Sequence, residues 1–201
     1  MKEFDDSKNL GKRDQTKVMN RQQILEAAKN LFADKGFEAT NVRDIIHESQ
    51  LSPGTFYNYF QSKEEIFEIL TDAVINDVRE QIKSVYHIGR LTAVEIRAAF
   101  VNFFNVFSSD PLLMKFLSRN QSYLRELRNK GRFDGILQDL EENLERAVAD
   151  GTLPALPVKI VSIAVFGAVF EILATMVVTP KFDIAKATET LAAFFLIQSE
   201  K

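Results

Sequence analysis

Two helix-start signals stand close together in the first third of the chain, and they confine the residues between them to one short helix. Ser52 is a good N-cap, and Pro53 follows at the first helical position, where its missing N–H group costs nothing. Ser62 starts the next helix, with Glu65 at the spacing of a capping box. A helix of about two turns is therefore expected between the two caps.

Helical periodicity extends along the whole chain, which has only 8 glycines and 5 prolines in 201 residues. One apolar stripe is formed by Ile24, Ala27, Ala28, Leu31 and Phe32. We expect an all-α fold with about nine helices, at 15–35, 41–49, 53–60, 62–86, 92–109, 110–118, 133–150, 157–179 and 183–198. Residues 121–130 either form a further helix or continue 110–118 with a kink.

The segment from 21 to 70 has the layout of a helix-turn-helix. Two short helices meet at a tight turn, Gln50-Leu51, after a longer helix and before a capped one. On the second short helix, Phe56 and Phe60 are four residues apart and form the inward face. The outward side carries small, hydroxyl and amide groups: Gly54, Thr55, Tyr57 and Asn58. In a helix-turn-helix this helix lies in the DNA major groove, where such groups contact phosphates and bases.

Four sequence segments carry a more specific resemblance. They are Ile24 to Ala28 with Leu31-Phe32, Gly36 to Thr40, Leu51 to Phe60, and Ser62 to Glu65. In order and spacing they resemble the signature of the TetR family of bacterial transcription regulators, over about 50 of the 201 residues. The resemblance implies a flexible N-terminal arm at 1–14, a DNA-binding domain at 15–63, and an effector-binding and dimerisation domain at 64–201.

The resemblance also implies a DNA-binding surface, made of Arg43, Ser52, Gly54, Thr55, Tyr57, Asn58, Tyr59 and Lys63. Arg43 is expected to contact a base edge, most simply a guanine, and Asn58 is well placed for a base. As an alternative, Arg43 is a solvated surface charge.

Hydroxyl and cationic groups of the same surface are expected to bind the DNA backbone. Thr55, Tyr57 and Tyr59 are the expected phosphate and sugar contacts, although Tyr59 lies near the apolar stripe and could pack in the core instead. Lys63 opens a helix, where its charge and the helix N-terminus both favour a phosphate. Ser52 would add another hydroxyl contact.

The net charge of the N-terminal part of the chain does not by itself favour DNA binding. Residues 1–60 hold nine Lys or Arg and nine Asp or Glu, so the N-terminal domain is formally neutral. DNA affinity must then depend on where cations lie, with Lys12, Arg13, Lys17 and Arg21 as candidates, and we expect a modest salt dependence.

The run Ile160 to Val178 is almost entirely apolar, with Glu171 inside it. Its length would suit a membrane span, which supports an alternative function as a membrane-associated or scaffolding helical protein. A helix that is apolar all round can also be buried on every side. The resemblance favours burial, because the last two helices of the family pack against their mates in a homodimer. We therefore expect no membrane insertion, and Glu171 is either a paired interface group or a ligand contact.

Phenylalanine is abundant, at 17 residues, and tryptophan is absent. Any single Phe is best explained as core, but together they indicate an apolar cavity that suits a hydrophobic effector. The candidate ligand contacts are Phe100, Phe103, Phe104, Phe107, Phe116, Arg119, Asn120, Tyr123, Phe166, Phe170 and Glu171. The sequence does not identify the effector, the operator or the regulated genes.

Composition argues against catalysis and metal chemistry. Cysteine is absent, and the two histidines, His47 and His87, are far apart and are more simply surface residues than ligands. No Glu-x-x-His pair, phosphate-binding loop or nucleophile elbow occurs. No cofactor or metal is expected. The charged N-terminus lacks the apolar segment of a signal peptide, so a cytoplasmic location is expected.

Overall fold

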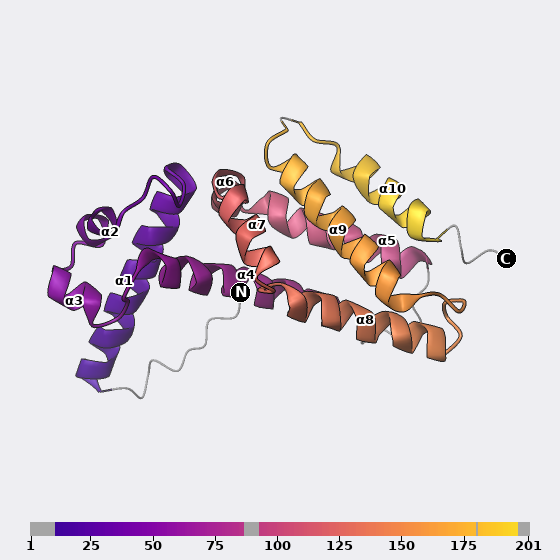
Figure 1. The fold of residues 1–201 in the computed structure, drawn as a ribbon, viewed down its shortest axis with the longest axis horizontal. Coiled ribbons are helices and arrows are strands. Elements are labelled where there is room, and N and C mark those ends of the chain that lie inside the picture. Colours follow the sequence, from indigo (N-terminus) through magenta and orange to yellow (C-terminus); the bar gives the residue numbers. More distant parts are fainter. Residues whose placement is uncertain (1–10, 87–92, 180, 197–201) are drawn as a thin grey trace.

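The computed structural model describes residues 11–86, 93–179 and 181–196, and every regular element in these ranges is a helix (Figure 1). The helices are α1 Lys12–Asp34, α2 Val42–Glu48, α3 Pro53–Tyr57, α4 Lys63–Tyr86, α5 Ala93–Ser109, α6 Pro111–Arg119, α7 Gln121–Asn129, α8 Asp134–Ala149, α9 Val158–Met176 and α10 Ile184–Leu196. The helices α1 to α3 form a small head, α5 to α10 form a larger body, and α4 extends from one into the other. The all-α expectation is confirmed.

Helix boundaries differ from the expected ones in two informative places. Asn120 adopts a non-helical conformation (φ −117°, ψ 19°), so α6 and α7 are separate helices and the described residues hold ten helices instead of about nine. α1 begins at Lys12, so the last residues of the predicted arm 1–14 are helical. Residues 1–10 of that arm, and His87, lie outside the described residues.

The capping signals act as the sequence predicts. Ser52 Oγ accepts a hydrogen bond from the N–H of Thr55, at 3.1 Å. Ser62 Oγ accepts one from the N–H of Glu65 at 3.2 Å, while the Glu65 carboxylate accepts from the N–H of Gln61 at 2.7 Å. These bonds satisfy N–H groups that a helix start leaves without an intrahelical partner.

The core of the head continues into the body. Buried apolar residues of α1 to α3 and of the first turns of α4 pack in one cluster with Phe116 of α6 and Tyr123 of α7. Its rings are in close contact: Phe37 stacks on Tyr123 with centroids 3.9 Å apart, and Phe67 stacks on Phe116 at 4.9 Å. The head therefore packs against α6 and α7 as well as continuing into α4, and it shares an apolar core with the body.

A buried side-chain amide completes this junction. Asn120, which is 3% exposed, donates hydrogen bonds to the carbonyl oxygens of Phe32 (2.9 Å) and Phe116 (2.6 Å) and accepts one from the N–H of Phe37 (2.6 Å). Gly36 lies alongside with φ +86°, and a Cβ there would stand 3.3 Å from the Arg119 carbonyl oxygen. The C-terminal end of α1 is thus held directly on the α6–α7 turn.

Ion pairs connect α4 to the helices of the body. The Arg79 guanidinium binds both carboxylate oxygens of Asp139 on α8, at 2.6 and 3.2 Å, and Asp139 is nearly buried. This hydrogen bond and the charge of Asp139 raise the pKa of Arg79. Arg132, just before α8, pairs with Glu68 and Asp72 of α4, each at 2.8 Å. Three ion pairs among five charged groups would have to be broken to move α4 away from α8 and the residues just before it.

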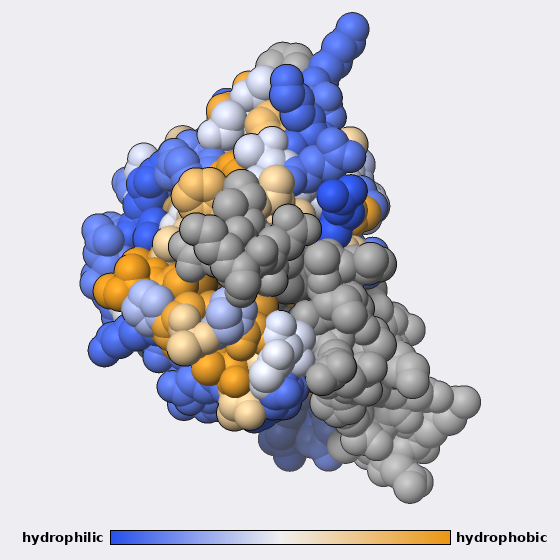
Figure 2. Space-filling view, turned by 90° about the vertical axis from the view of Figure 1, so that its right-hand side faces the viewer, coloured by the Kyte–Doolittle hydropathy of each residue, from blue (hydrophilic) through white to orange (hydrophobic). Residues whose placement is uncertain are grey.

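The outer side of α9 is apolar and exposed. Of the described helices, α9 alone is long and apolar enough to cross a membrane, and 6% of its most apolar stretch is buried. Large exposed apolar side chains on α9, just after it and on α10 are Ile160, Ile163, Val178 and Phe194. Seen from this end of the body, apolar side chains gather in one area of the surface (Figure 2). Within the described residues, Ile160 and Ile163 of this face remain exposed to solvent.

We predict that Asn120→Ala lowers the free energy of unfolding by about 2–4 kcal/mol, because it leaves the buried N–H of Phe37 without a partner and removes two further buried hydrogen bonds, to the carbonyl oxygens of Phe32 and Phe116. Urea denaturation followed by circular dichroism measures this. The control is Asn129→Ala, which changes an exposed asparagine at the last residue of α7. It should change the free energy of unfolding by less than about 0.5 kcal/mol. Equal stability of the two variants would contradict the structural role of Asn120.

Candidate nucleic-acid interface

The outer face of the helix-turn-helix is formed by α3 and the adjoining end of α2. The turn between them uses Gln50 with φ +55°, and Phe56 of α3 is fully buried. Gly54 and Asn58 are exposed, and the ring of Tyr57 is 51% exposed. This is the inward and outward division that the sequence predicts, and it leaves polar groups of α3 open to a partner.

Two hydroxyl groups at the start of α3 hydrogen-bond to each other. The oxygen atoms of Ser52 and Thr55 lie 2.8 Å apart, and Ser52 also accepts from the backbone N–H of Thr55. One hydroxyl proton is used between them, so one remains for an external acceptor such as a phosphate. Ser52 is exposed and Thr55 is half-buried.

Arg43 is exposed on α2, and no ion pair with it is formed within the described ranges. Its neighbour Asp44 instead accepts from the N–H of Asn41, in the capping box of α2, and lies 3.9 Å from Lys35. An exposed guanidinium on α2 can bind a base edge or a phosphate, since it presents five donors in a plane.

Two other predicted DNA contacts have structural partners. The Lys63 ammonium donates to the carbonyl oxygens of Phe37 and Thr40, both at 2.8 Å, and lies 4.3 Å from the centroid of the Phe37 ring. Tyr59 is half-buried against the core of the head. Lys63 therefore joins the start of α4 to the loop after α1 and keeps at most one proton for a phosphate. The DNA contacts of both residues stay predictions.

The predicted ligand contacts fall into separate places. Phe116, Asn120 and Tyr123 lie in the junction between head and body, where burial is the main cause of the raised pKa of Tyr123. Arg119 is exposed beside them at the end of α6. Asn120 forms three hydrogen bonds with backbone groups, which gives it a structural role, and its contact with a ligand stays a prediction.

The remaining aromatic candidates lie deeper in the body. Phe104 and Phe107 are buried, and Phe100 and Phe103 pack on them, in a second core that includes Ile75 and Val78 of α4. Phe166 and Phe170 on α9 form a ring cluster with Phe133. The structure thus brings the α5 rings together with α4, whereas the α9 rings face α7.

Glu171 forms an ion pair with Arg125 of α7, its two oxygens each 3.1 Å from one guanidinium nitrogen. Sequence reasoning missed this arginine and also Arg128, which lies over the Phe166 and Phe170 rings at 5.3 and 4.9 Å. A small apolar depression beside them is lined by Leu117, Gln121, Leu124, Arg125, Phe170, Leu173, Ala174 and Val177. No periodicity within α7 or α9 could have paired these residues, because their contacts join distant segments.

Residues 24–70 match the family of bacterial regulatory proteins named tetR. Among curated proteins, the uncharacterized HTH-type transcriptional regulator YfiR of Bacillus subtilis is 42% identical over 66 residues, which are 32% of this chain and 32% of that protein. The chain is thus matched over about a third of the length of this relative, in the part that includes the helix-turn-helix.

Solved structures extend the likeness to both halves. A chain from Syntrophomonas wolfei assigned to the TetR family is 26% identical, with a TM-score of 0.72 over 90% of this chain and 95% of that one. The regulator FadR of Bacillus subtilis, solved in complex with stearoyl-CoA, is 24% identical, with a TM-score of 0.67 over 90% and 98%. The helix-turn-helix geometry, the match at 24–70 and the shared two-part architecture agree: residues 24–70 match the TetR family of bacterial regulatory proteins, and the whole chain has the fold of TetR-family regulators.

Proposed function

We propose that this protein is a cytoplasmic, sequence-specific transcription repressor that binds a palindromic operator as a homodimer and leaves it when a hydrophobic effector binds the body. The observation that carries the proposal is the outer face of α3. Tyr57 and Asn58 are exposed there over a fully buried Phe56, and Arg43 is exposed on α2. A helix anchored on one side and polar on the other is what major-groove docking requires.

A second copy of the chain is the proposed partner for α9 and α10. The exposed stripe of α9 contains Ile160 and Ile163, and it also carries small residues, Ala164 and Gly167, that allow a close approach of helices. A two-fold dimer buries the same patch on both chains and presents two α3 helices to two half-sites. Burial by a second copy accounts for the apolar helix without a membrane.

The proposed effector is a molecule with a long apolar part. The rings of α5 pack directly on Ile75 and Val78 of α4. FadR, which has the same fold, was crystallised with an acyl-CoA. A ligand inserted among these rings must push against α4, whose N-terminal end carries the head.

Release from DNA follows from the rigid connections of the head. Arg79 and Arg132 hold α4 on the body, and Asn120 holds the end of α1 on α6 and α7. A shift of α4 or α6 therefore moves the head as a unit and changes the distance between the two α3 helices of a dimer. Adjacent half-sites are separated by about 34 Å, one turn of DNA, so simultaneous docking is lost. The effector must bind the released form more tightly.

We predict that Arg43→Ala weakens binding to the operator by about 1–3 kcal/mol and relaxes the preference at one base-pair position in each half-site. Duplexes selected from a random pool by the full-length protein provide the operator, and competition with single-base variants gives the preference. Arg146→Ala, which changes an exposed arginine of α8, should leave affinity unchanged. A loss of equal size on every duplex would show that Arg43 binds only phosphate.

We predict that Ile163→Glu converts the dimer to monomers at micromolar concentration, because a two-fold interface would bury two unpaired carboxylates. Sedimentation equilibrium without detergent measures the mass. Val106→Glu, which places a carboxylate at an exposed apolar position of α5, should stay dimeric. A wild-type protein that is monomeric, or that stays in solution only with detergent or lipid, would contradict the proposed dimer and favour the membrane alternative.

A further inference from the structure

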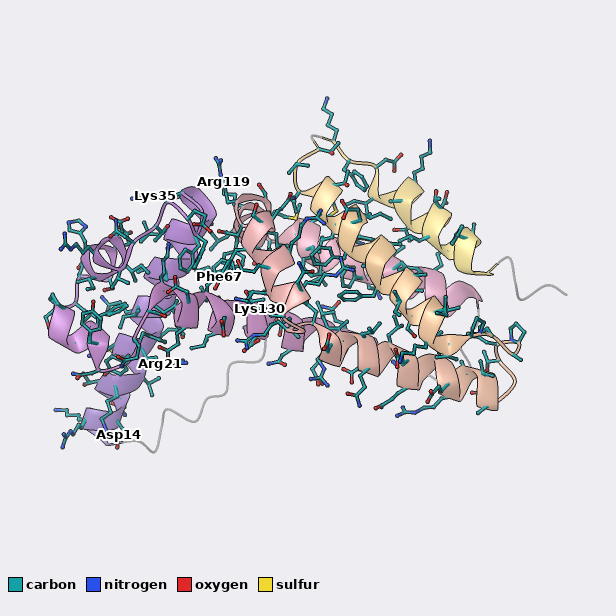
Figure 3. All side chains as sticks on the ribbon, viewed as in Figure 1. Asp14, Arg21, Lys35, Phe67, Arg119 and Lys130 are labelled. Carbon is teal, nitrogen blue, oxygen red and sulfur yellow. The ribbon has the colours of Figure 1, made fainter. Side chains whose placement is uncertain are left out.

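The first turns of α1 extend beyond the core of the head. In the segment 12–22, which we call the α1 projection, Asn20 is half-buried and all other residues are exposed. The first fully buried residue of the helix is Ile24. Two contacts near the end of this segment join the helix to the rest of the head: the Arg21 guanidinium lies 5.4 Å from the Phe60 ring, and Gln23 donates to the Ser49 carbonyl oxygen at 2.7 Å. Figure 3 shows Asp14 at the far end of the helix and Arg21 nearer the core.

Positive charge is concentrated on this projection. It holds four cations, Lys12, Arg13, Lys17 and Arg21, and one carboxylate, Asp14. Residues 24–63, by contrast, hold four cations and five carboxylates. The weak pair between Asp14 and Lys17, at 3.5 Å with both groups more than half exposed, is the one ion pair that joins described residues of the projection. The apparent neutrality of the head therefore conceals a separation of charge.

Three of the cations share one face. Arg13, Lys17 and Arg21 recur every fourth residue, and the same line continues to the buried Leu25. The face of α1 that packs on the head at Leu25 therefore carries these three cations nearer its N-terminal end, where they form a basic stripe. With a rise of about 1.5 Å per residue, Arg13 lies about 12 Å beyond Arg21 along the axis. In Figure 1, α3 and this end of α1 both lie on the side of the head away from the body.

Stability of the fold does not account for such a segment. Three mostly exposed helical turns gain little stability from burial, and Gly11 provides no side-chain cap for the helix start. Cations on one face also repel each other. A surface of closely spaced phosphates would remove both costs, because it neutralises the stripe and orders the helix.

We propose that the α1 projection is a second DNA contact, which binds backbone phosphates flanking the half-site that α3 occupies. The proposal rests on the proposed function, since α3 must dock in the major groove to bring the flanking duplex beneath the stripe. Phosphate contacts carry no sequence information, so the projection contributes affinity and position without base preference.

The test compares the full-length double variant Arg13→Gln, Lys17→Gln with the wild type on two duplexes: a selected operator with half a turn of flanking DNA on each side, and random DNA of equal length. Gln has nearly the helix propensity of Lys and Arg, so the helix is kept. The matched control is Lys130→Gln, Arg146→Gln, which removes one lysine and one arginine from exposed pairs on the body.

The expected result is a smaller slope of log affinity against log salt for the double variant. Each lost phosphate contact lowers the slope by about 0.9, up to about 3.6 for two residues in each of two protomers. Selected and random duplexes should weaken by the same factor. Asp14→Asn, which raises the charge of the stripe, should steepen the slope.

If the double variant and its control have the same slope of log affinity against log salt, the proposal is overturned. The proposed function still stands in that case if the protein binds the selected operator more tightly than random DNA. A loss confined to the selected operator also overturns it, because that would show base contact. If the wild-type protein binds the selected operator no more tightly than random DNA, the proposed function itself is contradicted.

Discussion

The amide of Asn120 joins the two halves of this molecule, and the other functional surfaces depend on that junction. Its three hydrogen bonds connect the last turn of α1, the following loop and the end of α6. The stacked rings of Phe37 and Tyr123 lie beside it, and Lys63 holds Phe37 from the side of α4. Because two independent segments of the body hold the head, α4 and α6–α7, the orientation of α3 is determined by the body.

Local signals explain how much of this could be predicted from the sequence. The caps at Ser52 and Ser62, the inward Phe56 and the outward Tyr57 follow from neighbouring residues, and the structure confirms them. The α6–α7 break could not be chosen from periodicity, because Asn120 leaves the helical conformation in order to reach Phe32 and Phe37, which are far away in sequence.

The candidate site shows the same difference between features set by neighbouring residues and features set by contacts between distant segments. Exposure of the α3 face could be predicted from a helical wheel, whereas the partners of Lys63 and Glu171 could not. Lys63 binds carbonyl oxygens of the loop after α1, and Glu171 pairs with an arginine on another helix. A residue type suggests what a side chain can bind, but its partner is decided by which helices pack together. The aromatic residues show the same limit, since their spacing predicts a buried face and says nothing of what lies opposite.

Three surfaces of different chemistry result from this architecture: a polar face on α3, a basic stripe on the α1 projection and an apolar face on α9. The measurement that tests the account most directly is a hydroxyl-radical footprint of the wild-type protein on a selected duplex. The account predicts two protected patches related by a two-fold axis, about one helical turn apart, with protection extending into the flanks. A single patch, or no protection by a folded protein, would contradict a dimer that places two α3 helices in adjacent major grooves.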